Sequence, residues 1–258
     1  MKIGEIIDLS TKYTPERSCM VFLTMGCNLN CKFCNKSHLL HKDGGKNYDV
    51  DNLLGIVKTN YLIKCIYLLG GEPILQDDII VFCQRLSQIN RYIILQTNGL
   101  FPNKIKKILP YLNRIILNLK GPLNGERYSK ITNKNINIDN LIESFSLLNT
   151  QKKIPFDIKV TYVKGAQNPE DIHSILKFLT KKKFTGKFIL KQYEYLPNVK
   201  KEFKQKFKEP EHIDLIEILE PYVDKNLPYK IFLEDNVYEH AEIHKVFQKI
   251  IKEGNNNE

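Results

Sequence analysis

Three cysteines lie close together in one short stretch of the chain, at Cys27, Cys31 and Cys34. Three thiolates can hold three irons of a [4Fe–4S] cube and leave the fourth iron open to a small molecule, whereas an electron-transfer cluster normally has four cysteine ligands. Structural zinc also takes four ligands, commonly as two close pairs. The C-x3-C-x2-C spacing therefore favours a cluster with a reactive iron. Two other interpretations stay open: a zinc site completed by His38 or His41, and three unrelated thiols.

A pair of glycines, Gly70 and Gly71, is followed directly by Glu72 and Pro73. Paired glycines let the backbone approach a ligand closely because they carry no side chain. The glutamate and the proline add a hydrogen-bond acceptor held in a rigid turn. This turn can position a ligand, but an ordinary connection between a strand and a helix is an equally good interpretation of it.

Two further short segments combine polar side chains with glycine. Thr97 and Asn98 precede Gly99, and Lys120 precedes Gly121. Hydroxyl and amide groups can bind a carboxylate or a ribose, or simply close a turn. A lysine can neutralise a carboxylate or a phosphate, or lie on the surface. Each segment is ambiguous by itself, but together with the glycine pair and the cysteine triplet they predict one shared binding site.

Short apolar runs alternate with longer amphipathic runs along the chain, a pattern typical of β-α-β units. Strands are predicted at residues 19–24, 64–69, 92–96, 114–119, 156–163, 187–194 and 229–233. Helices are predicted at residues 49–59, 77–89, 103–112, 139–149, 169–181 and 211–220. The alternation predicts an α/β fold with a parallel sheet, in the form of an open or partial barrel. Because ligands collect at the carboxyl ends of parallel strands, the polar segments are expected at one edge of the sheet.

The chain has 258 residues, of which 42% are hydrophobic. This length is enough for one large α/β domain with a substantial core. No repeat or linker interrupts it, so we predict a single domain over residues 1–258. Its core lies at about 17–195, its C-terminal extension at about 196–258, and residues 255–258 form a frayed tail.

No segment approaches the ~20 consecutive apolar residues that cross a bilayer. The first five residues, Met1–Glu5, contain no apolar signal core. We therefore expect a soluble, cytoplasmic protein without membrane contact. The six cysteines do not resemble a disulfide framework in a chain of this length. Cys19, Cys65 and Cys83 fall in predicted strands or helices, where the prediction is a small buried hydrophobic residue.

The formal net charge is +10, which can indicate a polyanionic partner such as nucleic acid. However, the excess is almost entirely lysine, and arginine, the residue that reads phosphates and bases bidentately, occurs only five times. A general enrichment in Lys, Ile and Asn is the simpler explanation. The runs at 181–183 and 200–201 are therefore interpreted as solvated faces.

These motifs resemble those of the radical S-adenosylmethionine (radical SAM) superfamily, whose members share the cysteine loop and the GGEP turn. Within it, the chain is most similar to the small activating enzymes of glycyl-radical proteins, above all the activators of anaerobic ribonucleotide reductase. The segments that carry this narrower resemblance are Asp8–Thr11, Thr97–Gly99, Leu119–Pro122 and Leu190–Tyr193. The chain departs from the activators at three places, where it has Lys12-Tyr13-Thr14-Pro15, Asn35 and Asn118.

The resemblance implies a partial (βα)6 TIM-like barrel and a set of cofactor contacts. Cys27, Cys31 and Cys34 are expected to hold a [4Fe–4S] cluster. The expected contacts to S-adenosylmethionine (SAM) are Phe33 against the adenine; Gly70, Gly71, Glu72 and Pro73 around the methionyl amino group; and Thr97, Asn98 and Lys120 at the carboxylate or the ribose. No catalytic residue is expected beyond the cluster and SAM.

The resemblance also implies a reaction and partners. An electron donor of the flavodoxin or ferredoxin type would reduce the cluster, SAM would be cleaved to a 5′-deoxyadenosyl radical, and this radical would take hydrogen from a glycine of a partner protein. Two alternatives were weighed against this prediction. One is a radical SAM enzyme that modifies RNA, a nucleotide or a peptide, and the other is a zinc-stabilised binding module without catalysis.

Overall fold

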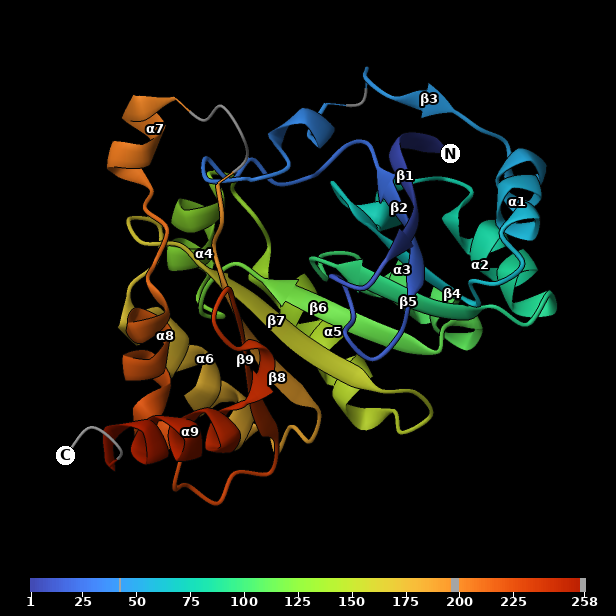
Figure 1. Ribbon diagram of the computed structural model, residues 1–258. Helices are drawn as coiled ribbons and strands as arrows, with labels where there is room; N and C mark the ends of the chain where they lie inside the picture. Colours follow the sequence, from blue (N-terminus) through green and yellow to red (C-terminus); the bar gives the residue numbers. More distant parts are fainter. Residues whose placement is uncertain (42, 196–199, 256–258) are drawn as a thin grey trace. The chain divides into compact units, whose positions relative to one another are not determined.

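A computed structural model describes residues 1–41, 43–195 and 200–255 (Figure 1). The contacts divide the chain into two compact units. The first unit consists of Met1–Asn118 and Thr132–Phe156, and the second consists of Leu119–Ile131 and Asp157–Glu258. The prediction of a single domain over residues 1–258 stays a prediction. Of the predicted frayed tail at 255–258, Asn255 is instead the last residue of a helix, and residues 256–258 lie outside the described residues.

The sheet of the first unit is mostly parallel. Its strands are β1 (Lys2–Ser10), β2 (Cys19–Thr24), β3 (Lys46–Asn47), β4 (Cys65–Gly70), β5 (Tyr92–Thr97) and β6 (Arg114–Leu119). They are arranged in the order β3-β1-β2-β4-β5-β6, with β1 antiparallel to its neighbours and the other pairs parallel. The carboxyl ends of four parallel strands therefore meet at one edge, as the sequence predicted.

The helices of the first unit differ in how they begin, and side chains cap the starts of two of them. The helices are α1 (Val50–Thr59), α2 (Ile79–Gln88), α3 (Pro102–Ile108) and α5 (Ile138–Thr150). The Asp49 carboxylate accepts a hydrogen bond from the Asn52 N–H at the start of α1, and Asn137 caps α5 in the same way through the Asp139 N–H. Each helix contacts the next in the order α1, α2, α3, α5.

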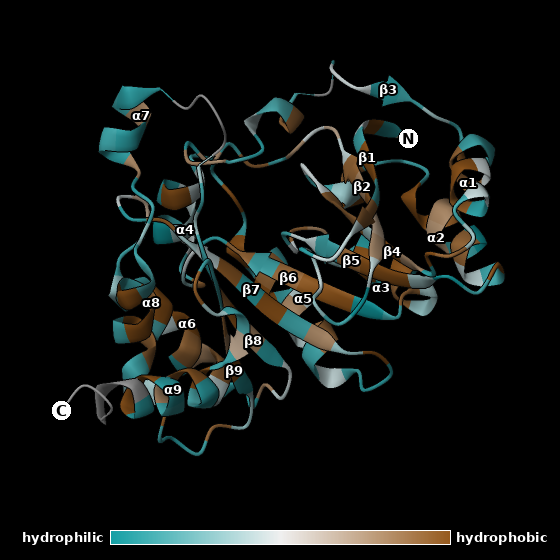
Figure 2. Ribbon diagram, viewed as in Figure 1, coloured by the Kyte–Doolittle hydropathy of each residue, from teal (hydrophilic) through white to brown (hydrophobic). Residues whose placement is uncertain are grey.

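The parallel strands of the first unit are largely buried, whereas β1 and β3 are mostly half-buried or exposed. All six residues of β2 are buried, and Figure 2 shows the hydrophobic colouring along β2 and β4. One core cluster is formed by Cys19, Val21, Leu23, Met25, Leu39, Cys65, Tyr67, Leu69, Ile94 and Ile116. Ile7, Tyr13 and Tyr92 pack against this cluster, so it lies beneath the segment that leads into β2.

The second unit has its own run of strands and helices. Its strands are β7 (Phe156–Tyr162), β8 (Lys187–Gln192), β9 (Lys230–Asp235) and β10 (Glu239–Glu242), in that order, with only the β9–β10 pair antiparallel. Its helices are α4 (Gly125–Thr132), α6 (Pro169–Lys181), α7 (Lys201–Lys206), α8 (His212–Leu219) and α9 (Ile243–Asn255). A capping box between Asn168 and Asp171 fixes the start of α6, and Pro169 occupies the first helical position.

A buried ionic group joins three strands of the second unit. The Glu234 carboxylate accepts from the ammonium groups of Lys159 and Lys191, each at 2.6 Å. Burial alone would raise the pKa of Glu234, but the two positive charges outweigh it and lower that pKa. The group is therefore held in its charged form, which offsets part of the cost of burying it.

The α/β class with a mostly parallel sheet is confirmed, and β2, β6 and α6 have the predicted bounds. Strand β1 was not predicted. Its pairing with β2 contains register shifts between Ile3 and Glu5 and between Ile7 and Ser10, so the strict alternation of buried and exposed residues is lost. Helices α4, α7 and α9 and strands β3 and β10 were also missed.

The prediction for Cys19 and Cys65 needs a correction. Both side chains are buried, as predicted, but they form a disulfide instead of packing as separate residues. The two residues are direct neighbours in the parallel register of β2 and β4, with Cα atoms 4.5 Å apart. Cys83 is confirmed as a buried core residue in α2, where burial raises the pKa of its thiol.

Two surface predictions can also be compared with the structure. Lys181, Lys182 and Lys183, and likewise Lys200 and Lys201, are exposed, as expected for solvated faces. No helix in the described part of the chain combines the length and the apolar character that a membrane crossing requires.

Candidate active site

The cysteine loop begins at the carboxyl end of β2 and is closed at its base by backbone hydrogen bonds. The Gly26 N–H donates to the Leu39 carbonyl at 2.8 Å, and the Cys27 N–H donates to the Leu40 carbonyl at 3.2 Å. A short 3-10 helix, η1 (Ser37–Leu39), supplies this closing segment. Both ends of the loop are thus held together at the edge of the sheet.

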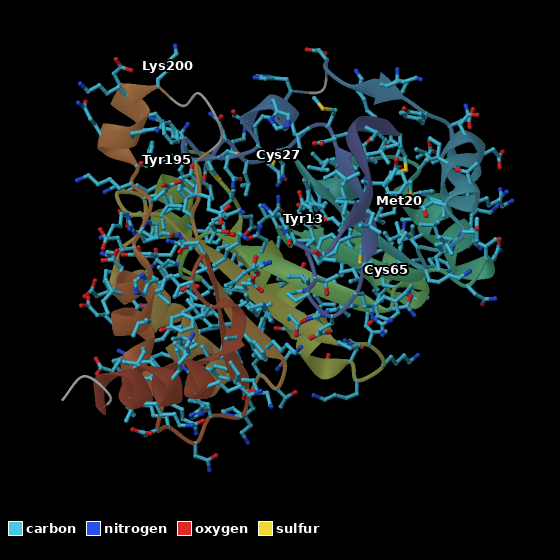
Figure 3. The ribbon with its side chains drawn as sticks, viewed as in Figure 1. Tyr13, Met20, Cys27, Cys65, Tyr195 and Lys200 are labelled. Atoms are coloured by element: carbon cyan, nitrogen blue, oxygen red, sulfur yellow. A yellow bond between two sulfur atoms is a disulfide. The ribbon has the colours of Figure 1, made fainter. Side chains whose placement is uncertain are left out.

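The three thiols differ in exposure. Cys31 is buried, whereas Cys27 and Cys34 are half-buried. The Cys34 N–H donates to the Cys31 carbonyl at 3.0 Å, which turns the last part of the loop back on itself. Figure 3 shows Cys27 well apart from Cys65, because Cys27 follows the carboxyl end of β2 and Cys65 is the first residue of the parallel strand β4. His38 and His41 are both exposed.

The arrangement of side chains does not by itself define a metal site among the residues that the structure describes. Within residues 1–41, 43–195 and 200–255, no three His, Cys, Asp or Glu side chains are arranged to hold a metal ion. The assignment of Cys27, Cys31 and Cys34 to the cluster therefore stays a prediction. The residue types are right for it, since thiolates are the usual ligands of iron–sulfur clusters.

The glycine pair lies directly against the cysteine loop. The Gly71 N–H donates to the Thr24 carbonyl at 2.9 Å, and the Glu72 N–H donates to the Gly26 carbonyl at 2.8 Å. A Cβ atom on Gly71 would lie 2.1 Å from the Gly26 oxygen, and one on Gly70, whose φ is +137°, would lie 2.2 Å from the Thr24 nitrogen. Neither position can carry a side chain, because backbone fills the space that the side chain would need.

Glu72 is almost fully buried, and its carboxylate is used inside the protein. One oxygen accepts from the Thr97 hydroxyl at 2.6 Å and from the Ile74 N–H at 3.3 Å. The other oxygen accepts from the Asn98 N–H at 2.7 Å. Glu72 therefore holds the turn after β4 against the end of β5, a positioning role that the sequence did not reveal. Its predicted contact with SAM stays a prediction.

Asn98 links this arrangement to the cysteine loop. Its side-chain NH2 group donates to the side-chain oxygen of Asn28 at 2.7 Å. Thr97 and Asn98 are both buried. The ends of β4 and β5 and the cysteine loop are consequently joined by one chain of hydrogen bonds from Glu72 through Asn98 to Asn28.

Gln76 is a second residue that sequence reasoning missed. Its side-chain nitrogen donates to the Met25 carbonyl at 2.7 Å, and its oxygen accepts from the Lys2 N–H at 2.7 Å. It thereby fastens the start of the cysteine loop to β1. The one signal in the sequence is its position: Gln76 follows Glu72 by four residues and comes directly after the 3-10 helix η2 (Pro73–Leu75).

The remaining predicted contacts occupy different surroundings. Phe33 is 6% exposed and directly precedes Cys34. Lys120 belongs to the second unit. There its N–H donates to the Tyr128 hydroxyl at 3.2 Å, and its carbonyl accepts from the Gln167 side chain at 2.6 Å. The contacts of Phe33 and Lys120 with SAM stay predictions.

Two buried polar atoms at this edge fit a bound cofactor. The Thr24 hydroxyl, at the end of β2, and the Asn118 side-chain oxygen, in β6, make no hydrogen bond to any described residue. Buried polar atoms normally have partners, so a ligand with hydroxyl or amino groups would satisfy them. These two atoms and the three thiols are of the chemical types that the expected cluster and SAM require, and their assignment to the cofactors stays a prediction.

Known proteins were compared with the chain as a whole. The family model of the Radical SAM superfamily matches residues 21–179. GTP 3′,8-cyclase of Aquifex aeolicus is 30% identical over 192 residues, which cover 68% of this chain and 56% of that protein. GTP 3′,8-cyclase of Helicobacter pylori is 28% identical over 232 residues, which cover 85% of this chain and 70% of that protein. The chain thus spans little more than half the length of the first of these relatives.

A relative of the predicted kind was also found. A putative glycyl-radical enzyme activating enzyme of Methanocaldococcus jannaschii is 28% identical over 179 residues, which cover 67% of this chain and 65% of that protein. The superfamily resemblance is confirmed, whereas the narrower resemblance to the activators is shared with GTP 3′,8-cyclases.

Solved structures agree on the fold. Streptococcus suis SuiB bound to S-adenosylmethionine has a TM-score of 0.65 at 19% identity, covering 83% of this chain and 49% of that one. TYW1 with a lysine-pyruvate adduct has a TM-score of 0.59 at 17% identity, covering 84% of this chain and 76% of that one. The predicted class, a mixed α/β fold with the open sheet of a partial barrel, is confirmed.

Proposed function

We propose that this chain, which belongs to the radical SAM superfamily, is an enzyme that modifies a nucleotide by a radical reaction. Its cofactors are a [4Fe–4S] cluster and SAM. When bound, these cofactors supply an electron and a cleavable sulfonium, which yield methionine and a 5′-deoxyadenosyl radical that takes hydrogen from the substrate.

The residues of the first unit have distinct tasks in this proposal. Cys27, Cys31 and Cys34 bind three irons as thiolates. The backbone at Gly70 and Gly71, which packs tightly against Thr24 and Gly26, forms the edge that SAM approaches. The hydrogen bonds from Glu72 through Asn98 to Asn28 hold this edge and the cysteine loop in register. Burial of these groups keeps water away from the reacting atoms.

The choice of a nucleotide as substrate rests mainly on the similarity to GTP 3′,8-cyclases. Two GTP 3′,8-cyclases align with 68% and 85% of this chain. The departures from the activator pattern at Lys12, Asn35 and Asn118 agree with a substrate other than a glycyl-radical protein. The net charge of +10 also suits an anionic substrate.

The substrate class can be tested with a coupling assay, which measures whether a nucleotide speeds up the cleavage of SAM. Anaerobically reconstituted protein with dithionite and SAM should release 5′-deoxyadenosine slowly, and GTP should raise the rate by about tenfold or more, because a bound substrate gives the radical a hydrogen to take. Chromatography with mass detection measures the product, with ATP, CTP and buffer compared in parallel. An unchanged rate with every nucleotide would contradict the proposal.

Glycyl-radical activation is the second candidate function, and the Methanocaldococcus relative favours it. Its partners would be a glycyl-radical protein and an electron donor of the flavodoxin or ferredoxin type. Anaerobic ribonucleotide reductase is a suitable trial partner. A doublet in its electron paramagnetic resonance spectrum after incubation with this enzyme, without any response to nucleotides in the coupling assay, would favour this candidate.

Glu72 allows a test of the site itself. Replacing Glu72 by alanine should weaken SAM binding by roughly tenfold while iron is retained, because three donors lose a buried acceptor and the end of β5 is no longer held. Equilibrium dialysis with labelled SAM and an iron assay measure the two quantities. The SAM affinity of Glu72→Gln, which keeps one acceptor oxygen, should lie between that of the wild type and that of Glu72→Ala. Loss of iron with intact SAM affinity would show that Glu72 supports the cysteine loop and not the SAM edge.

A further inference from the structure

Four side chains of the first unit form a continuous row between the cysteine loop and the middle of the sheet. The Lys36 ammonium donates to the Tyr13 hydroxyl at 3.3 Å and lies 5.6 Å from the centre of that ring. The Tyr13 ring packs on the Tyr67 ring with centroids 5.6 Å apart. The Tyr67 hydroxyl donates to the Gln96 side-chain oxygen at 2.8 Å. Lys36, Tyr13, Tyr67 and Gln96 are called the tyrosine row below.

The row ends beside the cysteine triplet. Lys36 is the second residue after Cys34, and it caps the 3-10 helix η1. The Leu39 N–H donates to the Lys36 carbonyl at 2.8 Å, so the backbone at Lys36 belongs to the closing segment of the cysteine loop. The cationic end of the row is therefore fixed to the loop that is assigned to the cofactor.

The charge of Lys36 is not matched by an acidic group. Lys36 is half-buried, and it forms no ion pair within the part of the chain that the structure describes. Its contacts are a neutral hydroxyl and an aromatic ring. By contrast, Arg114 lies 3.2 Å from the Glu16 carboxylate. A partly buried cation usually has an anionic partner, and a ring compensates it only in part.

The tyrosine row offers the groups that a nucleotide requires. We propose that Lys36 binds the phosphate groups of the substrate and that Tyr13 and Gln96 contact its base or ribose. An ammonium group binds phosphate as a point charge, an aromatic ring stacks on a base, and the Gln96 amide nitrogen can donate to a base edge. Tyr13 and Gln96 are both half-buried, so each presents part of its surface.

This inference rests on the proposed nucleotide substrate and adds the residues that select it. Tyr13 comes from the segment before β2, Lys36 from the segment after the triplet, and Gln96 from β5. The substrate would thus be held by elements that also position the cluster and the SAM edge. A hydrogen atom of the bound nucleotide would then be presented toward the cofactor by the same loop.

The binding of guanosine, GMP and GTP to the reconstituted protein distinguishes the phosphate contact of Lys36 from the base or ribose contacts of Tyr13 and Gln96. In the wild-type protein GTP should bind more tightly than guanosine. Lys36→Met should weaken GTP binding about 10- to 100-fold, the usual range for losing a charged contact, and leave guanosine binding unchanged. Lys36→Arg should retain most of the GTP affinity. Lys32→Met is the matched control, because Lys32 is exposed on the same loop, and it should behave as wild type.

Two readouts exclude a merely structural role for Lys36. Iron content and SAM affinity should be the same in Lys36→Met and in wild type. Unchanged GTP binding in Lys36→Met would overturn the inference, and so would an equal loss of GTP and guanosine binding, which would indicate collapsed packing around Tyr13. If the wild-type protein binds none of the three compounds, the nucleotide proposal itself fails and the inference falls with it.

Discussion

Replacing Cys31 by alanine is expected to remove most of the iron and to abolish the release of 5′-deoxyadenosine. The wild-type chain should hold about four irons, because the three predicted thiolate ligands can support one cube. No cysteine follows Cys83, so the sequence offers no thiolates for a second cluster near the C-terminus. With two thiolates left, the cube loses one of its three protein anchors. Iron analysis and product detection after anaerobic reconstitution measure both effects.

Cys83→Ala is the control for this variant. Cys83 is fully buried in α2, away from the cysteine loop in sequence, and burial raises the pKa of its thiol, which makes it a poor iron ligand. We expect this variant to keep its iron and its activity at some cost in stability. If Cys31→Ala kept wild-type iron, or if Cys83→Ala lost as much, the assignment of the triplet would be wrong.

Replacing Gly71 by alanine is expected to have a similarly large effect through the backbone alone. The new methyl group would lie 2.1 Å from the Gly26 oxygen and 3.0 Å from the Leu39 oxygen, both backbone atoms that cannot rotate away. The turn after β4 would have to move away from the cysteine loop. SAM affinity should therefore fall by at least about a hundredfold, which corresponds to ~2.7 kcal/mol. Titration calorimetry on reconstituted protein measures the change.

Gly55→Ala is the control for Gly71→Ala, because it makes the same substitution where a methyl group can be accommodated. Gly55 lies within α1, and nothing stands within 4 Å of the place where its Cβ would be. Alanine favours a helix over glycine by ~1 kcal/mol. Gly55→Ala should thus bind SAM normally and unfold at a slightly higher temperature. Normal SAM binding by Gly71→Ala would mean that the turn does not form the SAM edge.

The parts of the fold that the sequence predicted well are those governed by local patterns. Strand β2 was predicted because five successive apolar residues, Cys19–Leu23, precede Thr24 and the loop that begins near Gly26. Helix α6 was predicted because Asn168 and Pro169 provide a strong start signal. Strand β1 was missed because its irregular register with β2 removes the period of two on which the prediction depends.

The sequence predicted the strand-end positions of several candidate site residues but not the contacts between them, and the assignment of these residues to the cofactors stays a prediction. The strand-end positions of Gly71, Glu72 and Asn98 followed from the parallel sheet. The use of the Glu72 carboxylate by Asn98, 26 residues away, could not be read from either segment. The same holds for the Cys19–Cys65 disulfide, which depends on which residues face each other across β2 and β4.

The function was predicted correctly at the level of the superfamily but too narrowly at the level of the substrate. The short motifs around Thr97 and Lys191 resemble those of activating enzymes, but short polar strand ends recur among enzymes that bind the same cofactor. Alignment over most of the chain brings GTP 3′,8-cyclases forward as well. Motifs that bind a shared cofactor cannot by themselves identify what the radical attacks.

Deuterium transfer is the most direct test of a radical reaction on a nucleotide. GTP that is deuterated at the carbon positions of its ribose, and in a second sample at its base, is incubated with the reduced, reconstituted enzyme and SAM. Mass spectrometry of the released 5′-deoxyadenosine should show deuterium from one of the two samples. Release of 5′-deoxyadenosine that contains no deuterium with either sample would contradict the proposal that GTP is the substrate.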